Sequence, residues 1–168
     1  MTPIVRRTAV AIAAVALVPA LGGCWTGLQA ATTLQGPSGD GGHATIGSVD
    51  VRQAVLVATN PVTGTETISA AVINNGNSDD VLQSIVVGNG SASTSLPTAG
   101  LSLAAGGAIA FGWNGGPSVG VYGLKAPISS FVQLTFVFRD AGTTSVQALV
   151  VPATGYYSAV TPAPPTKP

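Results

Sequence analysis

The sequence predicts an all-β domain, an antiparallel Greek-key β-sandwich of about seven strands. Three observations lead to this prediction. Apolar residues recur with a period of two through residues 45–152, turn-forming residues separate these stretches, and no segment of ten or more residues has an apolar helical face. Such alternation is typical of strands with one buried face, and several such strands between frequent turns are typical of a sandwich.

Residues 1–23 have the three parts of an export signal. A basic start at Arg6 and Arg7 precedes an apolar stretch over residues 8–21, and small residues follow it. This stretch is shorter than the roughly 20 residues of a membrane-spanning helix. We therefore expect a cleaved signal peptide, with a buried helix as the alternative. The general and the twin-arginine export routes both remain open.

The signal ends beside Cys24, which is the only cysteine of the chain. Leu21, Gly22, Gly23 and Cys24 resemble the bacterial lipobox, an apolar residue and two small residues before a cysteine. The resemblance implies that the Cys24 thiol carries a diacylglyceryl group and that cleavage makes Cys24 the first mature residue. Two acyl chains, at about 0.8 kcal/mol for each buried CH₂ group, are enough for stable anchoring. We expect a lipid-anchored protein on the extracytoplasmic face of the cell membrane.

Two segments flank the predicted domain, which spans residues 45–152. Residues 24–44 are rich in Gly, Ser, Thr and Gln and are typical of a flexible membrane tether. Residues 153–168 contain repeated prolines, which have no backbone donor, so we expect an exposed C-terminal tail there.

Within the domain, alternation and turn chemistry predict the strands in order. Between residues 49 and 57 the alternation loses phase at Gln53 and Ala54, which indicates a β-bulge, with Asp50 and Arg52 facing solvent. Residues 139–142 contain an Asp and a Gly and predict a short hairpin. The expected strands are 49–57, 66–73, 81–87, 93–96, 108–113, 131–138 and 143–151.

Three stretches resemble a known family in their order. They are VINNGNSDDVLQSIVV, LAAGG and GGPSVGVYGLKAPISSFVQLTFVFRDAG. They are similar to the landmarks of the periplasmic copper-chaperone domain called PCuAC, roughly over residues 46–151. With a lipobox in front, the chain also resembles small actinobacterial lipoproteins of the LpqE type. The resemblance implies a Greek-key sandwich of the cupredoxin-like or immunoglobulin-like kind.

The copper ligands implied by this resemblance do not carry over. PCuAC domains bind Cu(I) through Met and His, and their final His-x-Met pair follows a Gly-Gly turn. The corresponding residues are Ser118 and Gly120, and the chain has one methionine, Met1, and one histidine, His43. We expect His43 in the tether as a weak candidate metal ligand. No metal and no cofactor other than the Cys24 lipid are therefore expected.

The other candidates concern contacts. Charged residues make up 7 % of the chain and form no basic cluster, which argues against nucleic acid as a partner. Asp79 and Asp80 are expected to accept bonds from local backbone N–H groups in a turn, with calcium as the alternative. Trp113 and Tyr122, together with Tyr156 and Tyr157, are candidates for a contact surface. For Trp113 the alternative is a structural plug at one end of the sandwich.

These expectations lead to a functional hypothesis. The chain is expected to be a non-enzymatic lipoprotein with a binding or structural role in the bacterial cell envelope. Its partners are expected to be the membrane, through the anchor, and an unidentified envelope protein or ligand. Two alternatives remain, a PCuAC-like copper chaperone and a carrier of an apolar ligand, and the carrier needs a cavity of roughly 300 Å³ or more.

Overall fold

The computed structural model describes residues 41–60, 64–90, 92–113 and 115–164, all within a unit that spans residues 39–168. The predicted signal peptide, the lipobox and Cys24 lie outside the described residues. In the part that is described, no helix has the length and apolar character needed to cross a membrane. The statements below concern these described residues.

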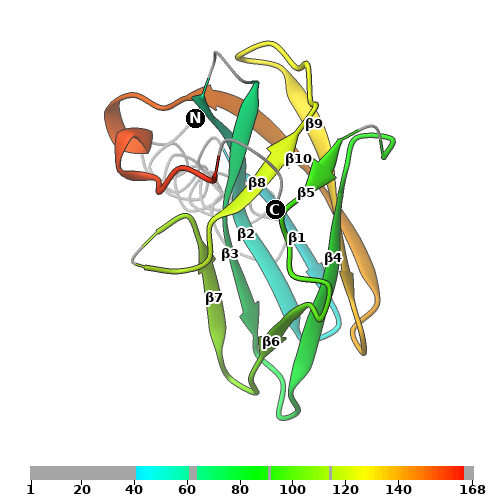
Figure 1. Cartoon of the computed structure of the whole chain (residues 1–168). Helices are drawn as coiled ribbons and strands as arrows, with labels where there is room; N and C mark the ends of the chain where they lie inside the picture. Colours follow the sequence, from blue (N-terminus) through cyan, green and yellow to red (C-terminus); the bar gives the residue numbers. More distant parts are fainter. Residues whose placement is uncertain (1–40, 61–63, 91, 114, 165–168) are drawn as a thin grey trace, which may run out of the picture. The chain divides into compact units, whose positions relative to one another are not determined.

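Strands make up most of the described chain, as predicted (Figure 1). The single helical element among these residues is a short 3₁₀ helix, η1 (Gly155–Ala159). The strands, in chain order, are β1 (Gly42–Ile46), β2 (Val49–Asn60), β3 (Thr65–Asn74), β4 (Asp80–Val87), β5 (Ser93–Thr94), β6 (Leu101–Leu103), β7 (Ala108–Phe111), β8 (Val119–Tyr122), β9 (Phe131–Phe138) and β10 (Thr143–Pro152).

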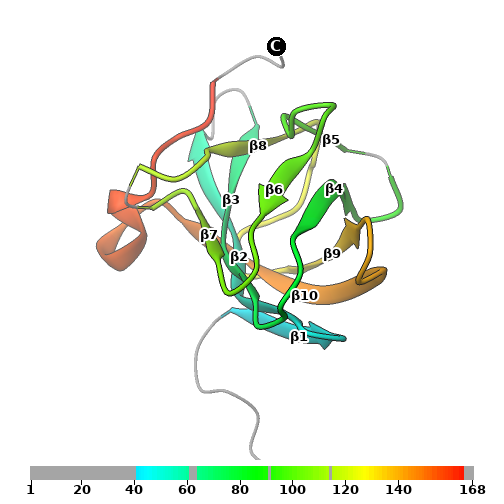
Figure 2. The same ribbon diagram turned by 90° about the horizontal axis from the view of Figure 1, so that it is seen from below.

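The strands form a curled sheet around one interior (Figure 2). Their order is β5-β8-β3-β2-β10-β9-β4-β6, with β1 added to β2 and β7 added to β3. The two sides of the curl meet where Val87 pairs with Ala92 in an isolated bridge. Strands distant in sequence, such as β2 and β10, are neighbours, as Greek-key connections require. The predicted all-β sandwich class is confirmed.

The sheet is mixed rather than purely antiparallel, which corrects the prediction. Residues 149–152 of β10 run parallel to residues 55–58 of β2. The first half of β2 is occupied on this edge by β1, so only its second half is open to β10. The direction of β10 is fixed by its hairpin with β9, which itself pairs with β4. Alternation within a strand carries no information about these distant partners.

The predicted bulge in β2 is present and divides the strand. Gln53 has a φ of 53°, and the register against β3 shifts between Arg52 and Val55. A positive φ is uncommon for a residue other than glycine. Because of the extra residue, Ala54 and Leu56 continue the inward face, while Val55 faces the opposite side.

The main core fills the inside of the curl. Its largest fully buried side chains are Phe111, Phe136, Leu56, Ile68, Leu82, Leu103 and Leu134. Burial of each such side chain contributes about 1.5–3 kcal/mol, so this cluster is the main source of stability. These residues come from strands that are far apart in sequence, which makes the domain a single cooperative unit.

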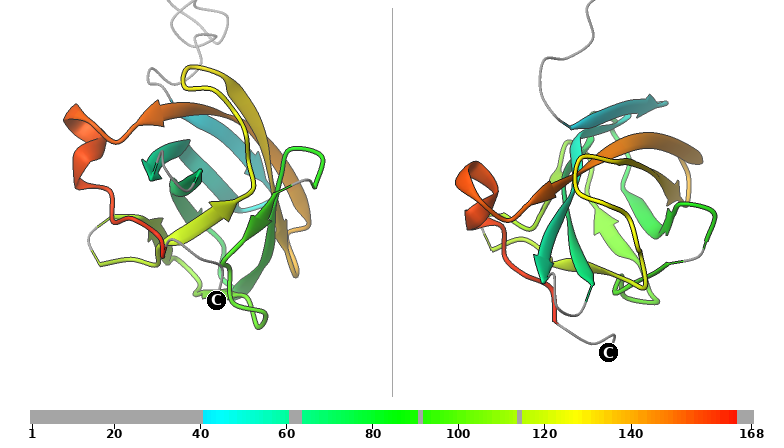
Figure 3. Two further views of the ribbon diagram at one scale, coloured as in Figure 1. Left: turned by 45° about the horizontal axis from the view of Figure 1, so that its top comes forward. Right: turned by 90° about the horizontal axis from the view of Figure 1, so that it is seen from above.

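A second apolar cluster lies on the outer side of the sheet. It contains Val55, Val57, Val151 and Val160, with Trp113, Leu149, Ala153 and Tyr157 packed against it. The segment after β10, residues 153–164, supplies its cover (Figure 3). Val160 is only 3 % exposed, and the N–H of Thr161 donates to the carbonyl of Gly112 at 2.9 Å.

Most residues of the described part of the expected tail, residues 153–164, are exposed, but Val160 and Ala163 are buried and hold the segment on the sheet. Two of its N–H groups bond to the rest of the domain, that of Thr161 to the carbonyl of Gly112 and that of Ala163 to the hydroxyl of Thr67. At the other end, β1 begins at Gly42, within the last residues of the expected tether, and continues into the expected domain. β1, β6 and β8 lie outside the strands expected from the sequence, and β6 and β8 are short.

Candidate functional site

Trp113 lies two residues beyond the end of β7, on the outer side of the sheet and within the second cluster. Its indole N–H donates to the hydroxyl of Ser69, with 2.6 Å between Nε1 and Oγ. Ser69 is on the outward face of β3, so this bond holds the indole over the sheet. Trp113 thus belongs to an outer cluster and not to the main core.

Two tyrosines of η1 continue this aromatic group. The rings of Trp113 and Tyr156 are tilted by 39° with centroids 5.0 Å apart. The rings of Tyr156 and Tyr157 meet edge to face, with centroids 5.3 Å apart. These distances are favourable for aromatic pairs. Tyr156 nevertheless remains 74 % exposed.

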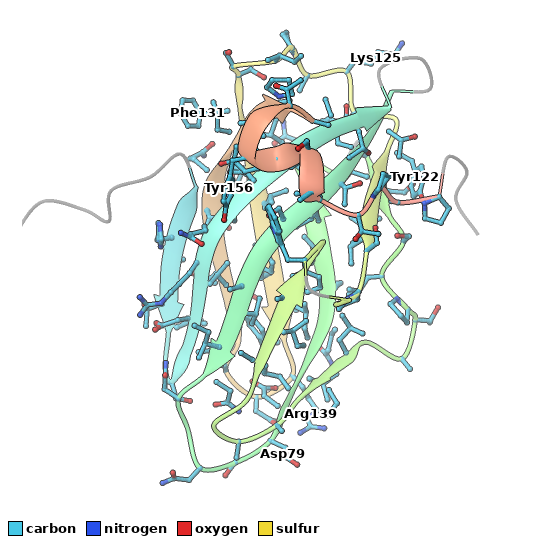
Figure 4. All side chains as sticks on the ribbon, turned by 90° about the vertical axis from the view of Figure 1, so that its left-hand side faces the viewer. Asp79, Tyr122, Lys125, Phe131, Arg139 and Tyr156 are labelled. Atoms are coloured by element: carbon cyan, nitrogen blue, oxygen red, sulfur yellow. The ribbon has the colours of Figure 1, made fainter. Side chains whose placement is uncertain are left out.

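Beside these rings lies an open depression of about 210 Å³, which we call the aromatic depression. It is lined by Gln53, Ser69, Ala70, Ala71, Ala110, Trp113 and Tyr156. All seven residues are uncharged. Gln53 reaches the site because of the bulge in β2, and Tyr156 reaches it because residues 153–164 pack on the sheet. Figure 4 shows Tyr156 on the short helix in front of the strands.

Tyr122, the other aromatic candidate, has a separate position. It lies at the end of β8, and its hydroxyl donates to the carbonyl of Pro164 at 3.0 Å. It does not line the aromatic depression. Tyr122 therefore lies outside the aromatic depression, and its bond holds Pro164 against β8.

Ser118 and Gly120, which the sequence resemblance led us to expect at the place of a His-x-Met pair, also lie against this C-terminal segment. Ser118 Oγ donates to the carbonyl of Thr161 at 3.0 Å. A Cβ atom at Gly120 would lie 2.6 Å from the hydroxyl of Tyr122 and 2.8 Å from Cβ of Ala163. Neither distance leaves room for a side chain at residue 120.

His43, expected in the tether, lies in β1 of the domain and is half-buried. Its Nε2 atom is buried and has no hydrogen-bond partner in the structure. Among the described residues, His, Cys, Asp and Glu form no group of three or more that is able to hold a metal ion.

Asp50 was expected to face solvent, but only 9 % of it is exposed. Arg52 Nη2 and Thr45 Oγ1 each lie 2.6 Å from one of its carboxylate oxygens, and Asn75 donates at 3.2 Å. The bond from Arg52, followed by that from Thr45, lowers the pKa of Asp50 below its ordinary value. This carboxylate therefore has a structural role.

Asp80 accepts backbone bonds, as predicted, although two of its donors are distant in sequence. Its oxygens accept from the N–H groups of Val81, Asp140 and Ala141 at 2.7, 3.0 and 2.9 Å. Burial raises the pKa of Asp80, but these N–H groups outweigh burial and lower the pKa below its ordinary value. Asp79 accepts from the N–H of Ala105 at 2.8 Å.

A larger depression of about 550 Å³ surrounds these aspartates. It is lined by Gly47, Ser48, Asn74, Gly76, Asn77, Ser78, Asp79, Asp80, Asp140 and Ala141. Its walls carry hydroxyl, amide and carboxylate groups, so it does not suit an apolar ligand. The Asp80 carboxylate already accepts bonds from three backbone N–H groups, so it has few lone pairs left to coordinate a calcium ion.

Glu66 is a buried acid that sequence reasoning missed. It lies in β3 and is 6 % exposed, and its Oε2 has no hydrogen-bond partner. Burial raises the pKa of Glu66 to about 7, and a bond from its own backbone N–H only partly opposes this. Its burial was predictable from the alternation along the strand, because Glu66 is two residues before inward-facing Ile68 and therefore shares its face.

Comparisons with known proteins show the fold. No protein-family model matches the chain, and the search of curated proteins gives no match. Among solved structures, the chain is similar to the copper-bound PCuAC domain from PmoF2, with a TM-score of 0.54, 17 % identity and coverage of 66 % of this chain and 97 % of that one. The chain is also similar to the apo PmoF2 PCuAC domain, with a TM-score of 0.53, 17 % identity and coverage of 68 % of this chain and 97 % of that one. For the apo PCuAC domain from PmoF1 the TM-score is 0.53 and the identity 23 %, with coverage of 64 % of this chain and 97 % of that one.

Proposed function

We propose that this chain is an exported lipoprotein, anchored to the extracytoplasmic face of the membrane through Cys24, whose β-sandwich acts by binding rather than by catalysis. The lipobox-like residues 21–24 support the anchor. The observation that supports a binding role is the aromatic depression, where the exposed ring of Tyr156 lies tilted against Trp113 beside uncharged polar groups. Ordered but exposed aromatic rings offer a large contact area at a small entropy cost.

The acidic groups support the same conclusion. The carboxylates of Asp50 and Asp80 accept several hydrogen bonds within the fold, and Asp79 accepts one more. Glu66 is buried and lines neither of the two depressions described above. Paired acid–base chemistry requires two titratable groups near one reacting atom. The described residues offer no such pair beside the aromatic depression.

The anchor is tested by metabolic labelling with a radioactive or clickable fatty acid in a bacterial host. The unchanged chain should be labelled and should sediment with membranes. Cys24→Ser should lose the label, whereas the matched control Gly23→Ala, which keeps a small residue before the cysteine, should retain it. A Cys24→Ser protein that is still labelled and normally processed would rule out this lipoprotein assignment.

Copper transfer is the second candidate, because the solved structures that this chain resembles include a copper-bound PCuAC domain. The domain would then bind Cu(I) through a ligand set that differs from a His-x-Met pair. His43 is the side chain to test, since its Nε2 is buried and unpartnered. A competition titration with a Cu(I) chelator decides the question. Micromolar or tighter binding that is lost in His43→Ala would favour the chaperone over the first proposal.

A further inference from the structure

We propose that the aromatic depression binds one ring of a neutral saccharide. This inference rests on the proposed binding function and names its ligand class, but it does not depend on the lipid anchor. It follows from the charge, the shape and the fixed geometry of the residues that line the depression.

The lining selects against charged ligands. None of the seven lining residues is acidic or basic. A charged ligand group placed there would lose water without gaining an opposite charge, which is costly in free energy. The ligand that fits this surface is therefore neutral.

The arrangement of apolar and polar groups favours a sugar ring. Trp113 and Tyr156 form an aromatic wall, and aromatic faces carry partial negative charge that attracts polarised C–H groups. The amide of Gln53 offers both donors and an acceptor, whereas the hydroxyl of Ser69, which is 4 % exposed, already accepts a bond from the Trp113 indole and has its own O–H left to donate. A pyranose has C–H groups on its ring face and hydroxyl groups around its edge, so it matches both kinds of surface together.

A purely aromatic ligand fits less well. The side chain of a phenylalanine or tyrosine would stack on the same wall, but its edge would remove water from Gln53 and Ser69 without replacing those hydrogen bonds. The floor beside the wall consists of the small residues Ala71 and Ala110. At about 210 Å³ the space is below the roughly 300–1,000 Å³ of drug-sized sites, which suits a single ring of an oligosaccharide whose remainder stays in solvent.

The site is formed before any ligand arrives. The bond to Ser69 fixes the indole of Trp113. Tyr156 is carried on η1, and the chain just after η1 is held by buried Val160 and by the N–H of Thr161, which bonds to Gly112. A wall that is already ordered loses little conformational entropy on binding. This explains why an aromatic ring that is 74 % exposed is nevertheless held in place.

The test is isothermal titration of the purified full chain, in a zwitterionic detergent that is not a glycoside. The probes are cellotriose, maltotriose, mannotriose, galactobiose and diacetylchitobiose, with galacturonic acid as a charged comparison and N-acetyltyrosinamide as an aromatic one. At least one neutral saccharide should bind. Tyr156→Ala should weaken that binding at least tenfold.

Two further variants separate the site from general effects on folding. Phe131→Ala removes another exposed aromatic side chain, one that is 66 % exposed and does not line the depression, and should change the affinity less than threefold. Ala71→Leu fills the floor while leaving both aromatic rings in place, and should also weaken binding at least tenfold.

Three outcomes would overturn the proposal: no saccharide of the panel binds, binding is unaffected by both Tyr156→Ala and Ala71→Leu, or N-acetyltyrosinamide binds more tightly than every saccharide. The last would indicate a peptide ligand. Lipid labelling at Cys24 is measured in a separate experiment. A failed saccharide test would therefore not affect the conclusion about the lipid anchor.

Discussion

The backbone N–H of Ala163 donates a 3.0 Å hydrogen bond to the side-chain hydroxyl of Thr67, which precedes it by 96 positions. Thr67 Oγ1 also lies 3.0 Å from Oγ1 of Thr59. Thr67 is fully buried, although its side chain lies on the face of β3 that alternation assigns to solvent. Residues 153–164 are thus part of the folded domain and cover the outer face of its central strands.

Val160→Ala should destabilise the domain by about 2 kcal/mol, because it removes buried methyl groups and leaves a cavity in the second cluster. Urea unfolding followed by far-UV circular dichroism measures the change. Val86→Ala is the matched control, since Val86 is 39 % exposed and its truncation should cost less than about 0.5 kcal/mol. Equal effects of the two changes would mean that Val160 is not packed as described.

Gly120→Ala should displace the C-terminal segment, because the new Cβ would lie within 3 Å of Tyr122 and Ala163. Limited proteolysis with chymotrypsin should then cleave faster after Tyr156 and Tyr157. Gly90→Ala is the control: it introduces strain at a φ of 80° but faces open space. It should lower stability without accelerating these cleavages. Unchanged cleavage in Gly120→Ala would contradict the packing of this segment on β8.

Glu66 should make the domain less stable as the pH rises. Its pKa is about 7 in the folded chain and 4.5 ordinarily, so between these values the folded state binds more protons than the unfolded state. The stabilisation from the protonated form is complete below pH 4.5 and is lost as the pH rises through 7. The loss is up to about 3 kcal/mol.

Glu66→Gln keeps the shape of the side chain and removes the titration. Its free energy of unfolding should therefore exceed that of the unchanged chain at pH 8 and match it at pH 4, as measured by urea unfolding in a series of buffers. Val86→Ala, which removes no titratable group, is the control and should leave the pH dependence as it is. A constant difference between Glu66→Gln and the unchanged chain at all pH values would show that Glu66 does not titrate in this range.

Asp80→Asn should destabilise the domain by about 2 kcal/mol at pH 7, because the amide replaces a charged acceptor of three backbone N–H groups. The pKa of Asp80 is lowered in the folded chain, so its contribution is present above the ordinary value of 3.8 and is lost as the pH falls below it. Thermal unfolding at pH 7 and pH 3 should show the difference shrinking in acid. Asp79→Asn should destabilise the domain less, because Asp79 accepts from one N–H group only. A larger loss of stability in Asp79→Asn than in Asp80→Asn would assign the structural role to Asp79.

Much of the local structure was predictable. The period of two identified the long strands, the phase change at Gln53 identified the bulge, and the residues 139–142 gave the hairpin, in which the N–H of Phe138 donates to the carbonyl of Gly142 at 2.7 Å. These features depend on the pleat of one strand or on the backbone preference of one or two residues, and both are properties of neighbouring positions.

The candidate site was predictable only in part. Trp113 and Tyr156 stood out as aromatic residues, but Tyr156 was placed in an exposed tail. Gln53 and Ser69 gave no signal as binding residues. They become a site because a bulge, the outer face of β3 and a segment near the end of the chain meet at one place.

By itself, the sequence determined the all-β class and the alternation that buries one face of each long strand, because side-chain direction reverses at every residue of a strand. Tertiary structure alone decided that β10 runs parallel to β2 and that residues 153–164 cover the other face of β3. Both depend on contacts between residues far apart in the chain. The energy of such contacts comes from buried area and paired backbone groups, and no local pattern specifies which distant segment supplies them.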